Sequence, residues 1–251
     1  MVLSILIALI GLAGCSAPPT ATLPPSPQTI SVSVPLALTP MQAALAACAG
    51  AHPDLLINLL ESPNRPPEPT DADLSLWLGD PPEDFESALL LAEESLGVIV
   101  HPASQLAELS AAQLRAIFSG QTRDWSDLDL EPGEIQVWVY PDGDQVREIF
   151  DRALLEGETV TALANLAPTP EAMIAAVAGD PGGIGYAPLA FLSSAVKQVD
   201  MDPELKEALT QPILGLSQKE PGGARRDLLR CLQSGEGQAS IAENYALWDR
   251  E

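Results

Sequence analysis

Apolar runs and amphipathic stretches alternate along most of the chain. Runs rich in Val, Ile and Leu predict strands, whereas apolar positions three and four residues apart predict helices. Strands that alternate with helices are typical of an α/β fold. Strands are expected at residues 30–38, 54–62, 72–78, 97–102, 135–140 and 184–191, and helices at 41–50, 84–94, 111–119, 145–154, 170–178 and 222–247.

Capping residues support two of these helices. Ser110 and Gln113 have the spacing of a capping box, and Gly120 follows the last apolar position of the same helix. Asp144 directly precedes the helix expected at 145–154, where its carboxylate can accept the free amides of the first turn.

The first 28 residues carry no charged side chain. Their apolar run has the length of a secretory signal and is too short to span a bilayer comfortably. It ends in Leu-Ala-Gly-Cys, which resembles the lipobox of bacterial lipoproteins, where a peptidase cuts before the cysteine and the sulfur carries diacylglycerol. We therefore expect a signal peptide at 1–14 and lipid on Cys15, and the alternative is an ordinary secretory signal in which Cys15 has no role.

The segment after Cys15 holds five prolines in thirteen residues. This composition favours an extended tether at 15–28 that reaches up to about 40 Å, at ~3.1 Å per residue. A globular domain held off the extracytoplasmic face of a membrane is the expected arrangement. In such a compartment Cys48 and Cys231 either form a disulfide or remain two separate buried thiols, and the sequence leaves both open.

Acidic residues dominate the charge, with 35 Asp and Glu against 12 Lys and Arg and a formal net charge of −23. We expect no nucleic-acid partner, because nucleic-acid phosphates are bound by clustered basic residues. The two histidines, His52 and His101, stand far apart, and no zinc-protease, phosphate-loop or serine-hydrolase motif occurs. We expect no enzymatic activity, no metal and no cofactor.

Four segments share their order with a known family. They are VIVHPAS, LSAAQLRAIFSG with Trp125 after it, YPDGDQVREIF and DPGGIGYAPLAFL, all between residues 96 and 192. The chain resembles the phosphate-type solute-binding proteins that serve ABC importers, and the resemblance extends more loosely over 29–247.

The resemblance implies a periplasmic-binding-protein type II-like fold with two lobes and two crossover segments. Lobe 1 would comprise residues 29–97 and 189–251, and lobe 2 residues 98–188, with crossings at 97–102 and 184–189. A small-molecule ligand would lie between the lobes, which close around it by a hinge motion. An ABC permease would be the protein partner.

The turn at 140–146 is where the resemblance implies an anion site, and it is also where the chain departs from the family. In the family the turn reads Arg-x-Asp-Gly-Ser-Gly-Thr, and its arginine, hydroxyls and glycine amide contact the oxyanion. Asp142 and Gly143 match this pattern. The positions that differ are Tyr140, Asp144, Gln145 and Val146, in place of the arginine, the serine, the second glycine and the threonine.

These differences argue against phosphate as the ligand. A buried phosphate needs a donor for nearly every oxygen. Asp144 offers a negative charge instead, and two like charges about 4 Å apart repel by roughly 4 kcal/mol at an effective dielectric of 20. The side chain of Val146 offers no donor.

Other candidate ligand contacts have structural alternatives. Thr39 lies near the family's first contact turn, or it caps the next helix. Trp77 either stacks on a ligand or fills an empty cleft. Arg147 either clamps a carboxylate or sulfonate or pairs with Asp151 one helical turn away. Tyr140 either donates to a ligand or is a satisfied interface tyrosine.

We expect a membrane-anchored solute-binding lipoprotein of an ABC importer, with a ligand other than phosphate. The alternative is a degenerate member of the family that acts as a surface adaptor or sensor without transport. The candidate ligand contacts are Thr39, Trp77, Tyr140, Asp142, Gly143, Asp144, Gln145 and Arg147.

Overall fold

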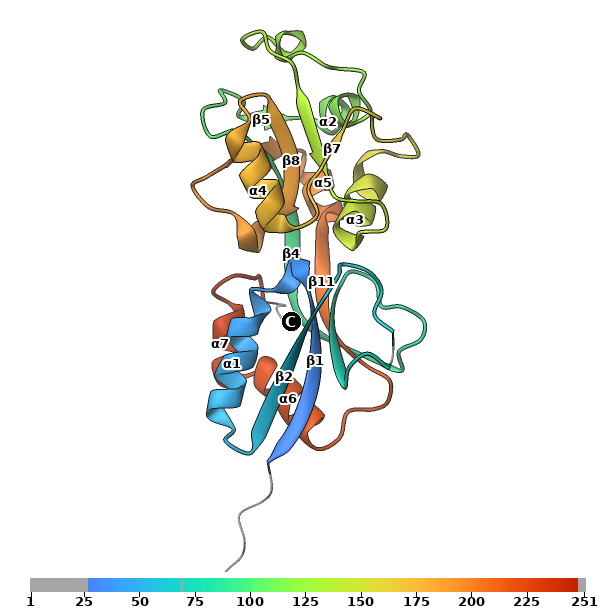
Figure 1. Ribbon diagram of the computed structural model, residues 1–251, viewed down its shortest axis with the longest axis vertical. Helices are drawn as coiled ribbons and strands as arrows, with labels where there is room; N and C mark the ends of the chain where they lie inside the picture. Colours follow the sequence, from blue (N-terminus) through green and yellow to red (C-terminus); the bar gives the residue numbers. More distant parts are fainter. Residues whose placement is uncertain (1–26, 69, 248–251) are drawn as a thin grey trace, which may run out of the picture.

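The computed structural model describes residues 27–68 and 70–247. The predicted signal peptide and Cys15 lie outside these residues. Two α/β lobes are stacked along the long axis of the molecule, which confirms the predicted two-lobed fold (Figure 1). No helix within the two described ranges is long and apolar enough to cross a bilayer.

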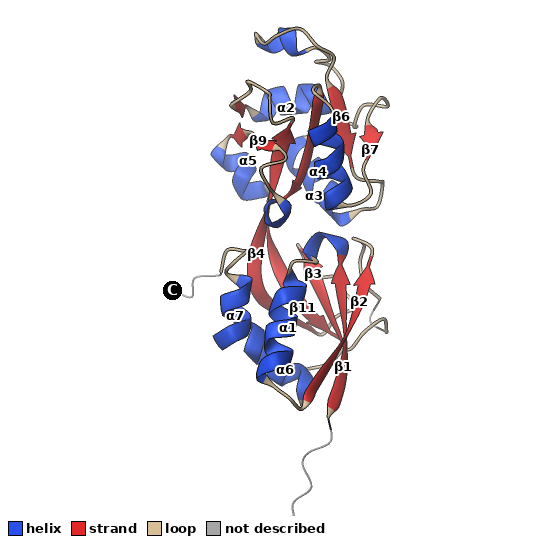
Figure 2. Ribbon diagram, turned by 60° about the vertical axis from the view of Figure 1, so that its left-hand side comes forward, coloured by secondary structure: helices blue, strands red, loops and turns tan. Residues whose placement is uncertain are grey.

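Lobe 1, the lower half of Figure 1, is built on a mixed sheet. Strand β1 pairs in parallel with β2 and β3, whereas β11 runs antiparallel to β3 and β4. Three helices lie together beside this sheet (Figure 2). The elements of lobe 1 are β1 (Gln28–Pro35), η1 (Leu36–Leu38), α1 (Met41–Ala51), β2 (Leu55–Ser62), β3 (Leu74–Leu78), the first part of β4 (Ser87–Val100), β11 (Thr210–Ser217), α6 (Ala224–Leu232) and α7 (Gly235–Ile241).

Lobe 2 continues the same sheet through the second part of β4. Strand β8 is antiparallel to β4 and parallel to β6, which in turn pairs in parallel with β7. Helices surround this half of the sheet (Figures 1 and 2). The elements of lobe 2 are β5 (Glu108–Leu109), α2 (Ala111–Phe118), η2 (Trp125–Leu128), β6 (Gln136–Val139), α3 (Gln145–Leu154), β7 (Asn165–Leu166), α4 (Pro170–Gly179), β8 (Gly183–Pro188), η3 (Leu189–Phe191), β9 (Lys197–Gln198), β10 (Asp200–Met201) and α5 (Pro203–Ala208).

The helix predicted at 84–94 is wrong, because residues 87–94 belong to the 14-residue strand β4 and residues 84–86 lie in the turn before it. Their Ala, Leu and Glu composition favours a helix locally. Residues 87–95 pair with β11, however, and residues 96–100 pair with β8. Strand partners along its whole length therefore override the local preference.

The two crossings between the lobes lie side by side. Ser95 of β4 faces Thr210 of β11, and their hydroxyl oxygens are 2.7 Å apart. After the predicted second crossing at 184–189, residues 197–201 still pair with strands of lobe 2, namely β4 and β5. These pairings favour a return to lobe 1 at Thr210, and we propose that boundary in place of residue 189.

A buried carboxylate marks the crossings. Glu94 of β4 is 3% exposed, and its Oε1 accepts the amides of Ser95 at 2.9 Å and Leu189 at 3.0 Å. The Ala190 amide lies 3.4 Å from Oε2. Burial raises the pKa of Glu94 to about 7 against the lowering effect of these amides. The side chain thus ties the residues that follow β8 to β4, close to where the chain passes between the lobes.

Lobe 1 is closed by a disulfide between Cys48 of α1 and Cys231 of α6, with Cα atoms 5.9 Å apart. This resolves the alternatives that the sequence left open in favour of the bond. Gly237 of α7 packs directly on it. A Cβ at this position would lie 2.5 Å from both Cys48 Sγ and the Cys231 carbonyl oxygen, so the three helices meet only because this residue is glycine.

Candidate functional site

The turn at 140–144 ends β6 and presents the start of α3 to lobe 1. Gly143 has φ +78°, a conformation that favours glycine. The next residue, Asp144, is the N-cap of α3, and its Oδ1 accepts the Val146 amide at 2.9 Å. Burial raises the pKa of Asp144, opposed by hydrogen bonds from Asn64, Val146 and Arg147. The chain therefore places its own carboxylate at the helix N-terminus, where an anion is otherwise stabilised.

Asn64, which the sequence analysis did not single out, connects this turn to lobe 1. It follows β2 and is 3% exposed. Its Oδ1 accepts the Ala37 amide at 2.7 Å, and its Nδ2 donates to Asp144 Oδ2 at 3.0 Å. Its backbone oxygen accepts the Gln145 amide at 2.6 Å. The residue thus occupies the space between η1 of lobe 1 and the start of α3.

Gln145 makes a second connection between the lobes. Its side chain is buried, and Nε2 donates to the Leu78 carbonyl at the end of β3, at 3.1 Å. A Cβ on Gly79 would lie 3.2 Å from this nitrogen, so the glycine leaves room for the amide. Gln145 contacts the opposite lobe directly and is already hydrogen-bonded there.

Arg147 is engaged by its own lobe. Its Nη1 donates to the Tyr140 carbonyl at 2.9 Å and lies 2.9 Å from Asp142 Oδ1. Its Nε lies 3.1 Å from Asp151 Oδ2, which confirms the pairing one helical turn away. Arg147 therefore pairs with two carboxylates of its own lobe in this arrangement, and a clamp for a ligand carboxylate stays a prediction.

Tyr140 belongs to the core of lobe 2 and does not line the cleft. Its ring is fully buried, with its centroid 5.5 Å from that of Tyr186, which stacks on Phe150 at 3.7 Å. The Tyr140 hydroxyl has no hydrogen-bond partner among the described residues, so it is not the satisfied tyrosine of the alternative prediction. Burial, with the charges of Asp144 and Glu171, raises its pKa well above the usual value.

Thr39 and Trp77 have structural contacts in lobe 1. The Thr39 hydroxyl bonds to the Leu36 carbonyl at 3.3 Å, and the N-cap of α1 is Pro40, so the predicted capping role of Thr39 is wrong. Trp77 is 2% exposed and donates from Nε1 to the Asp80 carbonyl. It packs with Leu214 in a small separate cluster, which excludes it as a stacking surface in this arrangement.

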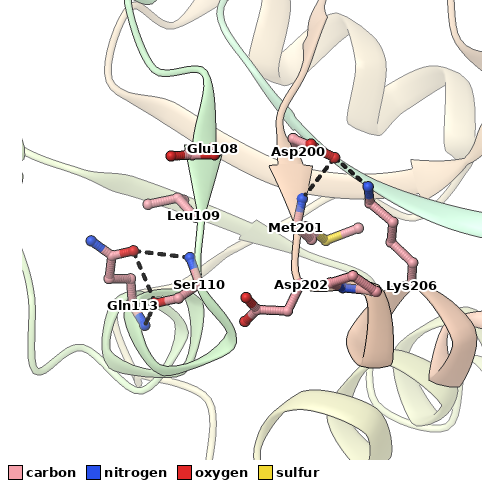
Figure 3. Close-up of a pocket in the computed structure, with 9 residues that line it drawn as sticks. Glu108, Leu109, Ser110, Gln113, Asp200, Met201, Asp202 and Lys206 are labelled. Carbon is pink, nitrogen blue, oxygen red and sulfur yellow. Dashed lines mark hydrogen bonds and ion pairs between the residues drawn. The ribbon is translucent and has the colours of Figure 1, made fainter.

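A cavity of about 420 Å³ lies away from the cleft, in lobe 2, between the β5–β10 pair and the starts of α2 and α5. Its polar groups bond to one another: Gln113 to Ser110, and Asp200 to Lys206 and the Met201 amide (Figure 3). No group of three or more His, Cys, Asp or Glu side chains in residues 27–68 and 70–247 is arranged to hold a metal ion.

Comparisons with solved structures show the same fold. A structure described as a phosphate ABC transporter substrate-binding protein with bound phosphate, from Clostridium perfringens, superposes with a TM-score of 0.77 at 19% identity, over 89% of this chain and 100% of the other. An ABC-type phosphate transport receptor from Vibrio cholerae gives 0.68 at 17%, over 88% and 100%. The CcmR regulatory domain of Synechocystis, in complex with 2-PG, gives 0.60 at 16%, over 82% and 95%.

The family model of the PBP superfamily domain matches residues 88–224, which is more than half of the chain. The matched segment includes β4, the whole of lobe 2 and β11. The predicted likeness to phosphate-type solute-binding proteins is confirmed at the level of the fold. The chain therefore belongs to the PBP superfamily.

Proposed function

We propose that this protein is a solute-binding lipoprotein of an ABC importer, anchored to the extracytoplasmic face of a bacterial membrane. Its family, its two-lobed fold and the sequence resemblance support a binding role between the lobes. The lipobox-like sequence at 12–15 supports the anchor, and an ABC permease is the expected partner. We expect no catalytic activity.

We further propose that the ligand is not phosphate, and Asp144 is the observation that supports this. Its carboxylate accepts hydrogen bonds from the Val146 backbone amide and the Asn64 side-chain amide. An anion bound at the start of this helix would need these two donors. A phosphate would meet a negative charge in place of a donor. At a separation of about 4 Å and an effective dielectric of 20, the two charges repel by roughly 4 kcal/mol, which lowers the affinity about a thousandfold.

A thermal-shift screen of oxyanions, carboxylates, carboxamides, sugars and amines tests the binding role. A specific solute at a hundredfold excess over its Kd stabilises the protein by about 2.7 kcal/mol. The import role also predicts that genes for permease and ATPase subunits lie beside this gene. Silence of the whole panel, in a genome without such neighbours, contradicts the import role.

The anchor has its own test. Cells that produce the protein are given an alkyne-tagged fatty acid, and labelling of the wild type is compared with that of Cys15→Ser. We expect label and membrane recovery for the wild type alone. Equal release of both proteins as unlabelled chains would support the ordinary secretory signal instead.

A second candidate, a surface adaptor or sensor without transport, is favoured by one observation. Asn64 and Gln145 connect the lobes across the cleft with hydrogen bonds from the chain itself. A protein that closes in this manner could present one fixed surface to a partner. The thermal-shift screen separates the candidates, because an adaptor of this kind gains no stability from any solute.

A further inference from the structure

The Asn64 side chain fills the space where the two lobes meet at the start of α3. It is buried, it lies between a lobe 1 amide and a lobe 2 carboxylate, and it makes one hydrogen bond to each. These partners, Ala37 and Asp144, are 107 positions apart in the sequence and face each other only when the lobes are together. The side chain that fills the gap comes from the loop after β2.

The orientation of this carboxamide is fixed by its surroundings. Oδ1 faces an N–H donor at 2.7 Å, and Nδ2 faces a carboxylate oxygen at 3.0 Å. Rotating the amide by half a turn would place donor against donor and acceptor against acceptor. The site between the lobes therefore favours a group that accepts a hydrogen bond from lobe 1 and donates a hydrogen bond to lobe 2.

We propose that Asn64 is an internal stand-in for the solute, and that the cleft recognises a neutral carboxamide-like group, a primary amide or a urea, in its place. This rests on the proposed binding role and names the chemical class of the ligand. A fully ionised oxyanion such as sulfate satisfies Ala37 but offers no donor to Asp144, and a hydrogen phosphate brings its own negative charge against this carboxylate. A carboxamide satisfies both, once the loop that carries Asn64 moves aside.

Chemical rescue tests this directly. The variant Asn64→Gly removes the internal carboxamide, and acetamide has the shape of the missing side chain. We expect acetamide to raise the Tm of Asn64→Gly in a saturable manner by about 2 °C or more, a shift of the size that a modest gain in stability produces in a chain of this length. Acetate, its charged isostere, should give no rise.

Two proteins serve as controls. The wild type, in which acetamide must displace the Asn64 side chain, should show a smaller rise than Asn64→Gly. Asn244→Gly, the same substitution at an exposed position of lobe 1, should match the wild type. In the double variant Asn64→Gly, Asp144→Asn the preference should reverse, because the carboxylate that repels acetate is gone. Equal responses to acetamide and acetate in Asn64→Gly would overturn the proposal.

A second variant tests the proposal if Asn64→Gly does not fold. Asn64→Asp keeps the shape but loses the donor and places two carboxylates together. We expect its Tm at pH 8 to fall by about 5 °C or more below the wild type, and the gap to narrow at pH 5, where one proton can be shared. A Tm equal to the wild type at both pH values would contradict the proposal.

The outcomes separate this proposal from the import role. If acetamide stabilises Asn64→Gly while the wild type responds to no solute of the screen, the result supports recognition of a carboxamide and contradicts the proposed import role. If the wild type binds a sugar or an amine and Asn64→Gly ignores acetamide, binding stands and the carboxamide class is wrong.

Discussion

Two carboxylates join the lobes, the buried Glu94 and the half-buried Asp144, and they do so differently. Glu94 lies on β4 and accepts amides of Ser95, its own neighbour, and of Leu189, which follows the strand paired with β4. Asp144 caps its own helix and reaches lobe 1 only through the side chain of Asn64. One contact is built into paired strands, whereas the other depends on a loop.

The difference indicates which contact survives an opening motion. At the hinge, β4 passes through both lobes, so rotation about it leaves Glu94 beside its partners. At the mouth of the cleft, rotation separates Asp144 from Asn64 and Gln145 from Leu78. We therefore propose that Glu94 belongs to a hinge and Asn64 to the contact that opens.

The largest expected loss of stability follows from substitution of Glu94, at the proposed hinge. Glu94→Ala leaves up to three buried amides without an acceptor and should lower the free energy of unfolding by about 4 kcal/mol, since each costs about 1–3 kcal/mol. Urea denaturation measures the loss. Glu93→Ala, the neighbouring substitution on the same strand, should change it by less than about 1 kcal/mol, and equal losses for both would remove Glu94 from the hinge.

The pH dependence of stability sharpens the same assignment. Because the pKa of Glu94 is raised from 4.5 to about 7, the folded state binds the proton more tightly. Its contribution is fully present below about pH 4.5, falls as pH rises to about 7, and amounts to at most about 3 kcal/mol. Glu94→Gln should remove this component from a series of urea titrations, and an unchanged profile would contradict the assignment.

At the cleft, Asn64→Ala should open the molecule. We expect a loss of about 2 kcal/mol in the free energy of unfolding, from two hydrogen bonds of a buried side chain. X-ray scattering in solution should show a larger radius of gyration than for the wild type. Asn244→Ala, at an exposed position, is the control and should match the wild type in both measurements.

The smallest effect is expected beside the cleft. Arg147→Met removes ion pairs with Asp142, whose side chain is 92% exposed, and with the partly buried Asp151. Solvent screens these pairs, and we expect a loss of about 1 kcal/mol or less, with no change in solute response. A response lost with Arg147 would return this residue to the binding site.

Local signals predicted much of the fold. The capping box of Ser110 and Gln113 and the cap at Asp144 are as the sequence indicates. The strand β4 was missed because its partners, β8 and β11, are distant in sequence and override its helical composition.

The candidate site was harder to predict, because its contacts are made between the lobes. Asn64 stands in a proline-rich loop with no motif around it. Its bond to the Ala37 amide lies within lobe 1, and only its bond to Asp144 depends on how the two lobes sit together. Trp77 and Tyr140 are large side chains at strand ends, and burial in the two lobes took both away from the cleft.

The central claim is that this cleft no longer accepts a tetrahedral oxyanion, and calorimetric titration with inorganic phosphate tests it most directly. We predict no binding heat for the wild type up to millimolar phosphate, and a measurable gain when Asp144→Ser restores the hydroxyl. A micromolar Kd for phosphate in the wild type, lost in a variant of the turn such as Gly143→Val, would contradict the account.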